Sequence, residues 1–141
     1  MHLEKRFDVG CTRKLAVETA ARDDTLTGLF PDTRTEIVES KAGRKTAVSH
    51  YTALGQAGTA TFHFEYDNDG NLRFEKVCNG NVWRELSGTL RFEERRRGTR
   101  VHIAMEGRTK TLVPEFTIKG PMRDQLEQMA TALREQLESA G

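Results

Sequence analysis

The sequence has few of the features that mark extracellular or nucleic-acid-binding proteins. Its two cysteines, Cys11 and Cys78, are far apart and lack metal-ligand spacing, which argues against a disulfide framework or a zinc site. Two buried free thiols are expected instead. The 22 basic and 21 acidic side chains leave a net charge of +1, so no overall positive field attracts nucleic acid. A nucleic-acid partner is therefore not expected.

Long apolar runs are also missing. No stretch approaches the roughly 20 apolar residues of a membrane span, so no integral membrane segment is expected. The first ten residues carry charges where a signal peptide needs an apolar core. These absences predict a soluble, cytoplasmic protein.

The sequence contains no recognisable catalytic or metal-binding set. His50, His63 and His102 lie in strand-like segments without HxH or HExxH spacing, so neither a metal nor another cofactor is expected. There is no nucleophile paired with a base, no pair of inward carboxylates and no glycine-rich phosphate loop. The glycines within 55–58 are interpreted as a turn. No catalytic residue is assigned.

The clearest pattern present is an amphipathic helix over residues 121–138. Its apolar residues recur at spacings of three and four and form one stripe: Met122, Leu126, Met129, Leu133 and Leu137. Pro121 is expected at the first helical position, with Gly120 as the joint before it. Residues 111–119 fit either a strand extension or an earlier turn of this helix. The helix needs a sheet to cover its stripe.

The rest of the chain predicts one strand, two short helices and then about six strands. The first strand covers 2–9, a helix capped by Thr12 covers 12–21, and a helical turn capped by Asp23 or Asp24 covers 25–30. The later strands are placed at 34–40, 44–54, 59–67, 71–78, 82–95 and 99–108. Asp69-Gly70 and Asn79-Gly80 are typical of tight hairpins. An antiparallel meander within a single domain, 1–141, is the simplest arrangement.

Each strand has one apolar face, because side chains alternate across a sheet with period two. That face gathers Phe62, Phe64, Tyr66, Leu72, Phe74, Val82, Leu86, Leu90, Phe92, Val101, Ile103 and Met105. The opposite face carries Glu65, Arg73, Glu75, Glu85, Arg91, His102 and Glu106. One layer of helices on the apolar face is therefore expected.

This order of elements resembles the START and polyketide-cyclase-like superfamily, also called SRPBCC, and the small bacterial branch of coenzyme Q-binding-like proteins and polyketide cyclases in particular. The resemblance covers essentially the whole chain and rests on element order and patterning. It implies an α+β helix-grip fold, in which a curved antiparallel sheet of about seven strands wraps a long C-terminal helix. In that fold a cavity lies between sheet and helix.

Arg84 is the most informative single residue, because the alternation places it between Val82 and Leu86 on the interior side. A buried guanidinium needs an anionic or carbonyl partner, so Arg84 is one candidate anchor for a ligand. In the alternative interpretation, a bulge near 79–82 shifts the register, or Arg84 lies at the rim beside a glutamate. Trp83 faces outward in one register and inward in the other.

The resemblance implies that the cavity binds a small hydrophobic molecule, such as a lipid, an isoprenoid quinone or a polyketide. The expected ligand-binding residues are Tyr51, Phe62, Phe64, Tyr66, Phe74, Arg84, Leu86, Met105, Met122, Leu126 and Met129. A carrier, chaperone or sensor is favoured over an enzyme. A cyclase or aromatase is the alternative, with Arg84 and Tyr51 or Tyr66 as polarising groups.

A second alternative is a protein-interaction module like the ribosome-associated toxin-like members of the superfamily. It would use Arg95, Arg96 and Arg97, which are otherwise interpreted as a solvated hairpin tip balanced by nearby glutamates. The expected oligomeric state is a monomer or a weak homodimer, formed through a long edge strand.

Overall fold

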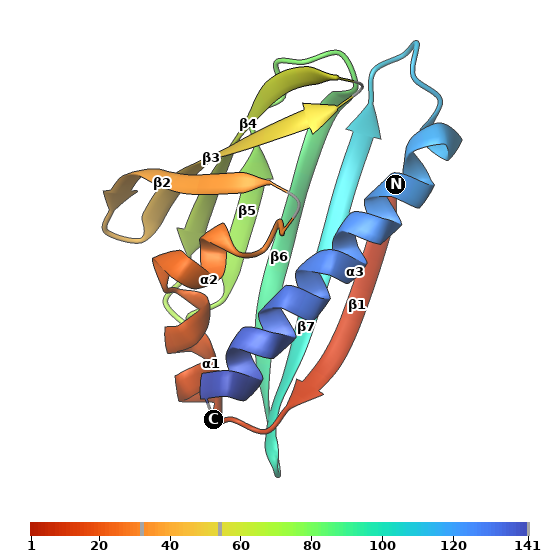
Figure 1. The fold of residues 1–141 in the computed structure, drawn as a ribbon. Coiled ribbons are helices and arrows are strands. Elements are labelled where there is room, and N and C mark those ends of the chain that lie inside the picture. The colour runs from red at the N-terminus through yellow and green to blue at the C-terminus, as the bar shows by residue number, and fades with distance from the viewer. Residues whose placement is uncertain (32, 54, 141) are drawn as a thin grey trace.

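The computed structural model describes residues 1–31, 33–53 and 55–140, which form one curved antiparallel sheet with three helices on one of its faces (Figure 1). In chain order the elements are β1 (His2–Val9), α1 (Arg13–Ala20), α2 (Asp23–Thr27), β2 (Arg34–Lys41), β3 (Arg44–Ala53), β4 (Gln56–Tyr66), β5 (Leu72–Lys76), β6 (Trp83–Arg95), β7 (Gly98–Thr109) and α3 (Glu115–Ala140). The strand order is β1-β7-β6-β5-β4-β3-β2. The α+β helix-grip architecture expected from the sequence is confirmed.

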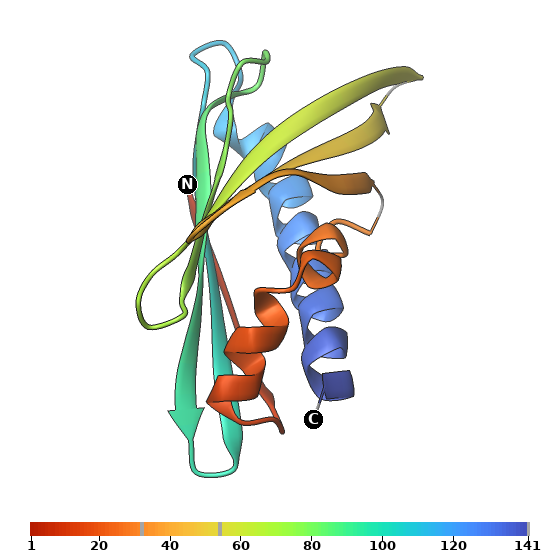
Figure 2. The ribbon, with the colours of Figure 1, turned by 90° about the vertical axis from the view of Figure 1, so that its left-hand side faces the viewer.

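The sheet bends around the helices. Figure 2 shows β6 and β7 almost upright, while β2, β3 and β4 swing across toward the side on which α3 lies. The helix itself packs closest to β1, β7 and α1. Space between α3 and the far half of the sheet must therefore be filled by side chains or left open.

The apolar stripe of α3 is confirmed, but its predicted start is wrong. Met122, Leu126, Met129, Leu133 and Leu137 are all buried. The helix begins at Glu115, so the alternative of an earlier helical turn is the correct one. Pro121 lies inside the helix, where its missing N–H leaves the carbonyl four residues earlier without its usual donor.

The first helix was predicted closely, whereas the second, predicted at 25–30, covers Asp23–Thr27. Thr12 caps α1 as expected, since its Oγ1 accepts a hydrogen bond from the Leu15 N–H at 3.2 Å. The predicted cap of α2 is wrong: Arg22 occupies the cap position without a side-chain hydrogen bond, and the two aspartates lie in the first turn. Acidic side chains there still favour the positive end of the helix dipole.

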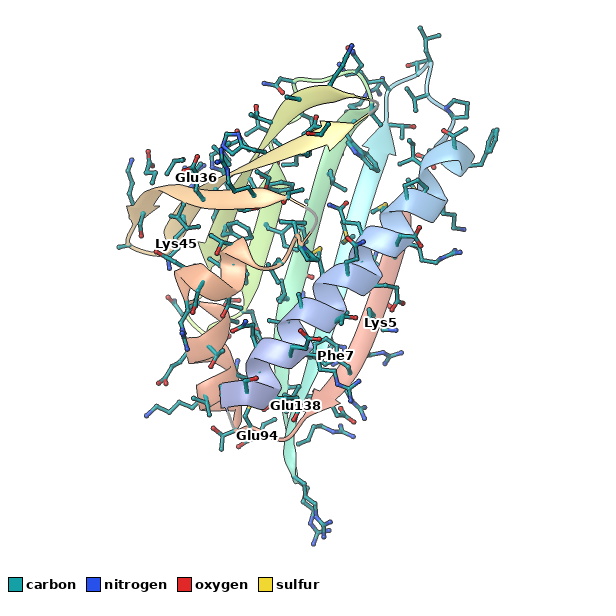
Figure 3. All side chains as sticks on the ribbon, viewed as in Figure 1. Lys5, Phe7, Glu36, Lys45, Glu94 and Glu138 are labelled. Carbon is teal, nitrogen blue, oxygen red and sulfur yellow. The ribbon has the colours of Figure 1, made fainter. Side chains whose placement is uncertain are left out.

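Two lysines connect the sheet to the helical layer (Figure 3). On β1, Lys5 Nζ lies 3.0 Å from the Glu127 carboxylate of α3. On β3, Lys45 Nζ donates to the Ala21 carbonyl at 2.7 Å and pairs with the Asp23 carboxylate at 2.5 Å. Lys45 therefore attaches β3 to the junction of α1 and α2.

One of the two predicted tight turns is confirmed. At Asp69-Gly70 the glycine has φ 84°, and the Asp67 carboxylate accepts hydrogen bonds from the N–H groups of Asp69 and Asn71. At Asn79-Gly80 the prediction is wrong, because residues 77–82 form a longer connection between β5 and β6. The predicted turn at 55–58 is also shorter than expected, since β4 already begins at Gln56; Leu54 lies outside the described residues.

A single core joins the apolar face of the sheet to the helices. Its largest fully buried side chains are Phe64, Phe74, Leu26, Leu29, Leu72, Leu90, Ile103, Met105, Met129, Leu133, Leu137 and Val101. Both cysteines are free, as predicted, but only Cys11 is buried; Cys78 is half-buried. None of the described helices combines the length and apolar character needed to cross a bilayer.

Candidate ligand pocket

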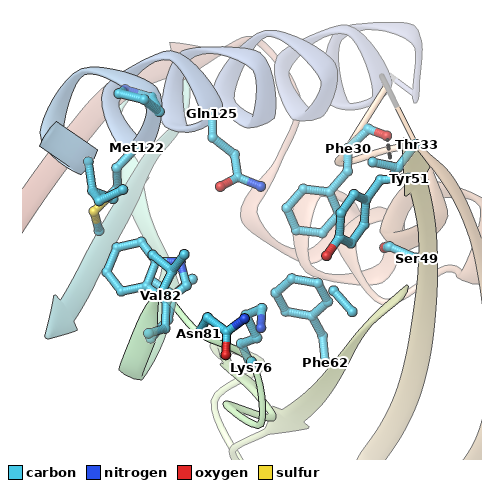
Figure 4. A pocket seen from close by; sticks show the side chains of 16 residues that line it. Phe30, Thr33, Ser49, Tyr51, Phe62, Lys76, Asn81, Val82, Met122 and Gln125 are labelled. Carbon is cyan, nitrogen blue, oxygen red and sulfur yellow. Dashed lines mark hydrogen bonds between the residues drawn. The ribbon is translucent and has the colours of Figure 1, made fainter. Parts of the chain in front are cut away.

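A pocket of about 380 Å³ lies between the inner face of the sheet and the first half of α3 (Figure 4). Its lining comes from six parts of the chain and comprises Phe30, Thr33, Ser49, Tyr51, Ala60, Phe62, Lys76, Gly80, Asn81, Val82, Trp83, Leu86, Ile118, Pro121, Met122 and Gln125. This volume falls in the range of roughly 300–1,000 Å³ typical of small-molecule sites. The lining is mainly apolar and aromatic, with a few polar groups.

Small inner side chains leave the space of the pocket, and large ones fill the rest of the region between sheet and helix. Where β3 and β4 line the pocket, the paired residues are Ser49 and Ala60. Further along β4 and β5 the paired residues are Phe64 and Phe74, whose ring centroids are 6.3 Å apart. These two buried rings fill the space between sheet and helix, so the pocket occupies only one end of the cavity that the fold could provide.

Four predicted ligand-binding residues line this pocket: Tyr51, Phe62, Leu86 and Met122. Five others belong to the packed core outside it: Phe64, Phe74, Met105, Leu126 and Met129. The alternation and the helical spacing correctly placed these side chains on the inner face. They could not tell a core position from a pocket position.

Tyr66 also lies away from the pocket. It is half-buried, and its hydroxyl has no hydrogen-bond partner among the described residues. Burial raises the pKa of Tyr66 to about 12, and the negative charge of Asp23 acts in the same direction. Its proposed role as a polarising group at the ligand has no geometric support.

The prediction that Arg84 points inward is wrong. The pairing of β6 with β7 is irregular between Trp83 and Glu85, which moves Arg84 to the exposed side. There its guanidinium donates to Thr111 Oγ1 at 3.3 Å. The alternative interpretation, in which a bulge shifts the register, is therefore correct. The irregularity lies at Trp83–Glu85, just after the expected segment 79–82.

Trp83 takes the inward place and was missed as a site residue. Its side chain is half-buried, lines the pocket and lies across Gly107 of β7. A Cβ atom at Gly107 would come within 2.5 Å of the indole ring. Val82, expected on the inner face of a strand, instead precedes β6 and borders the pocket with 37% of its surface exposed.

Two pocket hydroxyls are already engaged with the protein. Thr33 Oγ1 donates to the Phe30 carbonyl at 2.9 Å, the bond drawn in Figure 4, and lies 3.2 Å from Thr35 Oγ1. Ser49 Oγ lies 2.7 Å from the same Thr35 hydroxyl. This series of hydrogen bonds connects the segment before β2 to β2 and β3 along one wall of the pocket.

Other polar groups of the pocket are uncommitted. Within the described residues, no hydrogen bond engages the Tyr51 hydroxyl or the side-chain amides of Asn81 and Gln125. Figure 4 shows Gln125 reaching from α3 into the cavity, with Tyr51 on one side and Asn81 and Lys76 opposite. These residues come from separate elements, and no pattern in the sequence indicates that they meet.

The histidines have protein partners outside the pocket. His50 lies 3.0 Å from Glu36, His102 lies 3.0 Å from Glu93, and His63 lies 2.9 Å from Thr46 Oγ1. In the part of the chain that the structure describes, no group of three or more His, Cys, Asp or Glu side chains could hold a metal ion.

The three arginines 95–97 lie at the end of β6 and the turn to β7, as expected. Arg95 Nη1 lies 3.2 Å from the Glu93 carboxylate. The side chains of this tip are exposed. Whether they contact a partner stays a prediction.

The chain has the helix-grip fold of START-like proteins. Similar solved structures include TTHA0849 from Thermus thermophilus, with 16% identity over 100% of this chain and 99% of that chain and a TM-score of 0.80. A START superfamily protein from Mycobacterium smegmatis matches with 15% identity over 99% of each chain and a TM-score of 0.78. The Zhui aromatase/cyclase from Streptomyces sp. R1128 matches with 16% identity over 99% of this chain and 92% of that chain, at a TM-score of 0.77.

These similarities confirm the resemblance at the level of the fold. No protein-family model and no curated protein sequence matches the chain. The matched structures do not single out the coenzyme Q-binding branch. At identities of 15–16%, the matched structures define the architecture of this chain but do not assign their activities to it.

Proposed function

We propose that the protein binds a small lipophilic molecule in the pocket between the sheet and α3, as a carrier, chaperone or sensor. The observation that carries this proposal is the pocket itself: about 380 Å³ of space between the sheet and α3, walled mainly by aromatic and aliphatic side chains. Burial of apolar ligand surface in the pocket contributes a favourable free energy of roughly 25 cal/mol per Å² removed from water. Lipids, isoprenoid quinones and polyketide-like molecules are the candidate ligands.

A second candidate function is cyclase or aromatase chemistry on a polycarbonyl chain. The uncommitted Tyr51 hydroxyl and the amides of Asn81 and Gln125 favour it, because such groups could orient and polarise carbonyl oxygens. Two proteins of similar fold are described as an aromatase/cyclase and as a di-domain ARO/CYC. Turnover of a polycarbonyl substrate, lost in Tyr51→Phe while binding persists, would favour this candidate.

Binding can be tested with a neutral fluorescent probe, N-phenyl-1-naphthylamine, which gains intensity in apolar surroundings. The informative variant is Ala60→Trp, which fills the wall of the pocket. Thr61→Trp is the matched control, because adjacent strand residues face opposite sides of the sheet. We expect Ala60→Trp to weaken probe binding by at least about tenfold, corresponding to about 1.4 kcal/mol, and Thr61→Trp to leave it unchanged.

Folding of each variant is checked by circular dichroism, and Gln125→Trp provides a second way to block the pocket from α3. Native mass spectrometry of protein purified from cells would identify a retained ligand. Probe binding that is equally strong in wild type, Ala60→Trp and Gln125→Trp would place the binding elsewhere and refute the proposal.

A further inference from the structure

Two lysines lie on the apolar inner face of the sheet, and they differ in their partners. Lys45 is paired in register with Phe64, and Lys76 with Phe62, so both lysines share the face of those rings. The ammonium of Lys45 is satisfied by Asp23 and by the Ala21 carbonyl. Among the described residues, the only hydrogen bond of Lys76 Nζ goes to the carbonyl of its neighbour Val77, at 3.4 Å.

The surroundings of Lys76 contain no compensating charge in the part of the chain that is described. None of the pocket-lining residues is acidic, and Lys76 forms no ion pair with the described residues. The Lys76 side chain is half-buried along the pocket wall, and its ammonium, whose hydrogen bond to Val77 is exposed, lies at the pocket's edge with no anionic protein partner there among the described residues. A negatively charged ligand group could therefore reach and pair with it. A lysine that only covered the sheet could extend into solvent; Lys76 instead lies along the wall of the pocket.

Neutral hydrogen-bonding groups lie around the same cavity. The Tyr51 hydroxyl and the amide groups of Asn81 and Gln125 form no hydrogen bond with the described residues, and each can donate to an oxygen atom. A carboxylate has two oxygens that accept several hydrogen bonds, so one ammonium with two or three neutral donors is a suitable environment for it. The remaining lining, including Phe62, Trp83 and Leu86, suits a hydrocarbon body.

We propose that the pocket selects amphipathic ligands with a carboxylate or similar anionic end, and that Lys76 is the residue that anchors this end. This inference rests on the proposed function, because it assumes that the pocket binds a lipophilic ligand. It names the chemical class: a monoanionic lipophile such as a fatty acid. A neutral hydrocarbon or alcohol of the same length fits the apolar lining but leaves Lys76 without an anionic partner.

The test compares laurate with dodecanol as competitors of N-phenyl-1-naphthylamine, in wild type and in Lys76→Met. We expect wild type to prefer laurate by about 10- to 100-fold, the range for a hydrogen bond to a charged group. Lys76→Met should lose that preference while binding dodecanol as before, and Lys76→Arg should keep most of it. Lys119→Met, which removes the same charge from an exposed site next to the pocket residue Ile118, should behave as wild type.

Lys76→Gln repeats the test in case the methionine variant folds poorly. Equal displacement by laurate and dodecanol in wild type, or a preference that survives in both Lys76→Met and Lys76→Gln, would overturn the inference and leave the proposed function intact. If neither the neutral probe nor either competitor binds, the proposed function itself fails, and this inference with it.

Discussion

Gly88→Ala is expected to destabilise the protein, because the absence of a side chain at Gly88 makes room for the far edge of the Phe74 ring. The two residues are paired across β5 and β6. A Cβ atom at Gly88 would overlap the Phe74 ring, which is 1% exposed and belongs to the close-packed core. The added methyl group must therefore displace a buried aromatic side chain.

The size of the effect follows from two opposing contributions. Overpacking of a close-packed core typically costs about 1–3 kcal/mol. The loss of glycine's conformational freedom in the unfolded chain offsets about 0.4–1 kcal/mol of this. We therefore expect a net decrease of about 1–2 kcal/mol in the free energy of unfolding, measured from the midpoint of urea denaturation.

The matched control is Gly80→Ala, where an added Cβ meets no atom within 4 Å. It should leave stability unchanged or raise it slightly. A double-mutant cycle with Phe74→Leu isolates the contact: replacing the ring makes room for the methyl group, so the double variant should be more stable than the sum of the single effects by about 1 kcal/mol. A Gly88→Ala protein as stable as wild type, or strict additivity, would refute this packing argument.

Other substitutions test the helix, the buried tyrosine and the corrected register. Leu133→Ala should lower the free energy of unfolding by about 2–5 kcal/mol, whereas Leu112→Ala, at a side chain 94% exposed, should change it by less than about 0.5 kcal/mol in the same urea titration. The pKa of Tyr66 is raised from 10.0 to about 12, so the folded state holds this proton more tightly than the unfolded state, and the free energy of unfolding should fall as the pH rises from 10 to about 12. Tyr66→Phe should remove that part of the pH dependence. Because it also removes a buried hydroxyl that has no hydrogen-bond partner among the described residues, stability at neutral pH should be equal or higher. Arg84→Ala should leave probe affinity unchanged, whereas Trp83→Leu should alter it, and ligand binding should change the fluorescence of this single tryptophan; an equal effect of both substitutions would contradict the corrected register.

Much of the fold could be predicted because its elements are regular in sequence. The alternation of Phe62 and Phe64 with polar residues assigned the inner face of β4, and the recurrence from Met122 to Leu137 assigned the inner face of α3. The boundaries were predicted less well where the local signal is ambiguous. Gly120 and Pro121 are poor helix formers, yet α3 continues through them and contributes Ile118 and Pro121 to the pocket.

The errors at the site come from a register change that alternation cannot anticipate. One irregularity between Trp83 and Glu85 exchanges the directions of adjacent side chains, so Trp83 faces the pocket and Arg84 faces solvent. Lys76 was missed for a different reason. The alternation that places Leu72 and Phe74 inward extends to Lys76, but a lysine at the end of a short strand is usually solvated, and its pairing with Phe62 is what brings it to the pocket.

The sequence by itself determined the element order, the two faces of the sheet and the buried stripe of the last helix, because each depends on periodicity within one segment. Only the tertiary structure decided where the core ends and the pocket begins. That boundary depends on side-chain volumes contributed by segments far apart in the chain: Ser49 and Ala60 leave space against Gln125, whereas Phe64 and Phe74 fill it. Whether an inward residue contacts protein or ligand is therefore fixed by its neighbours in space, not by its own segment.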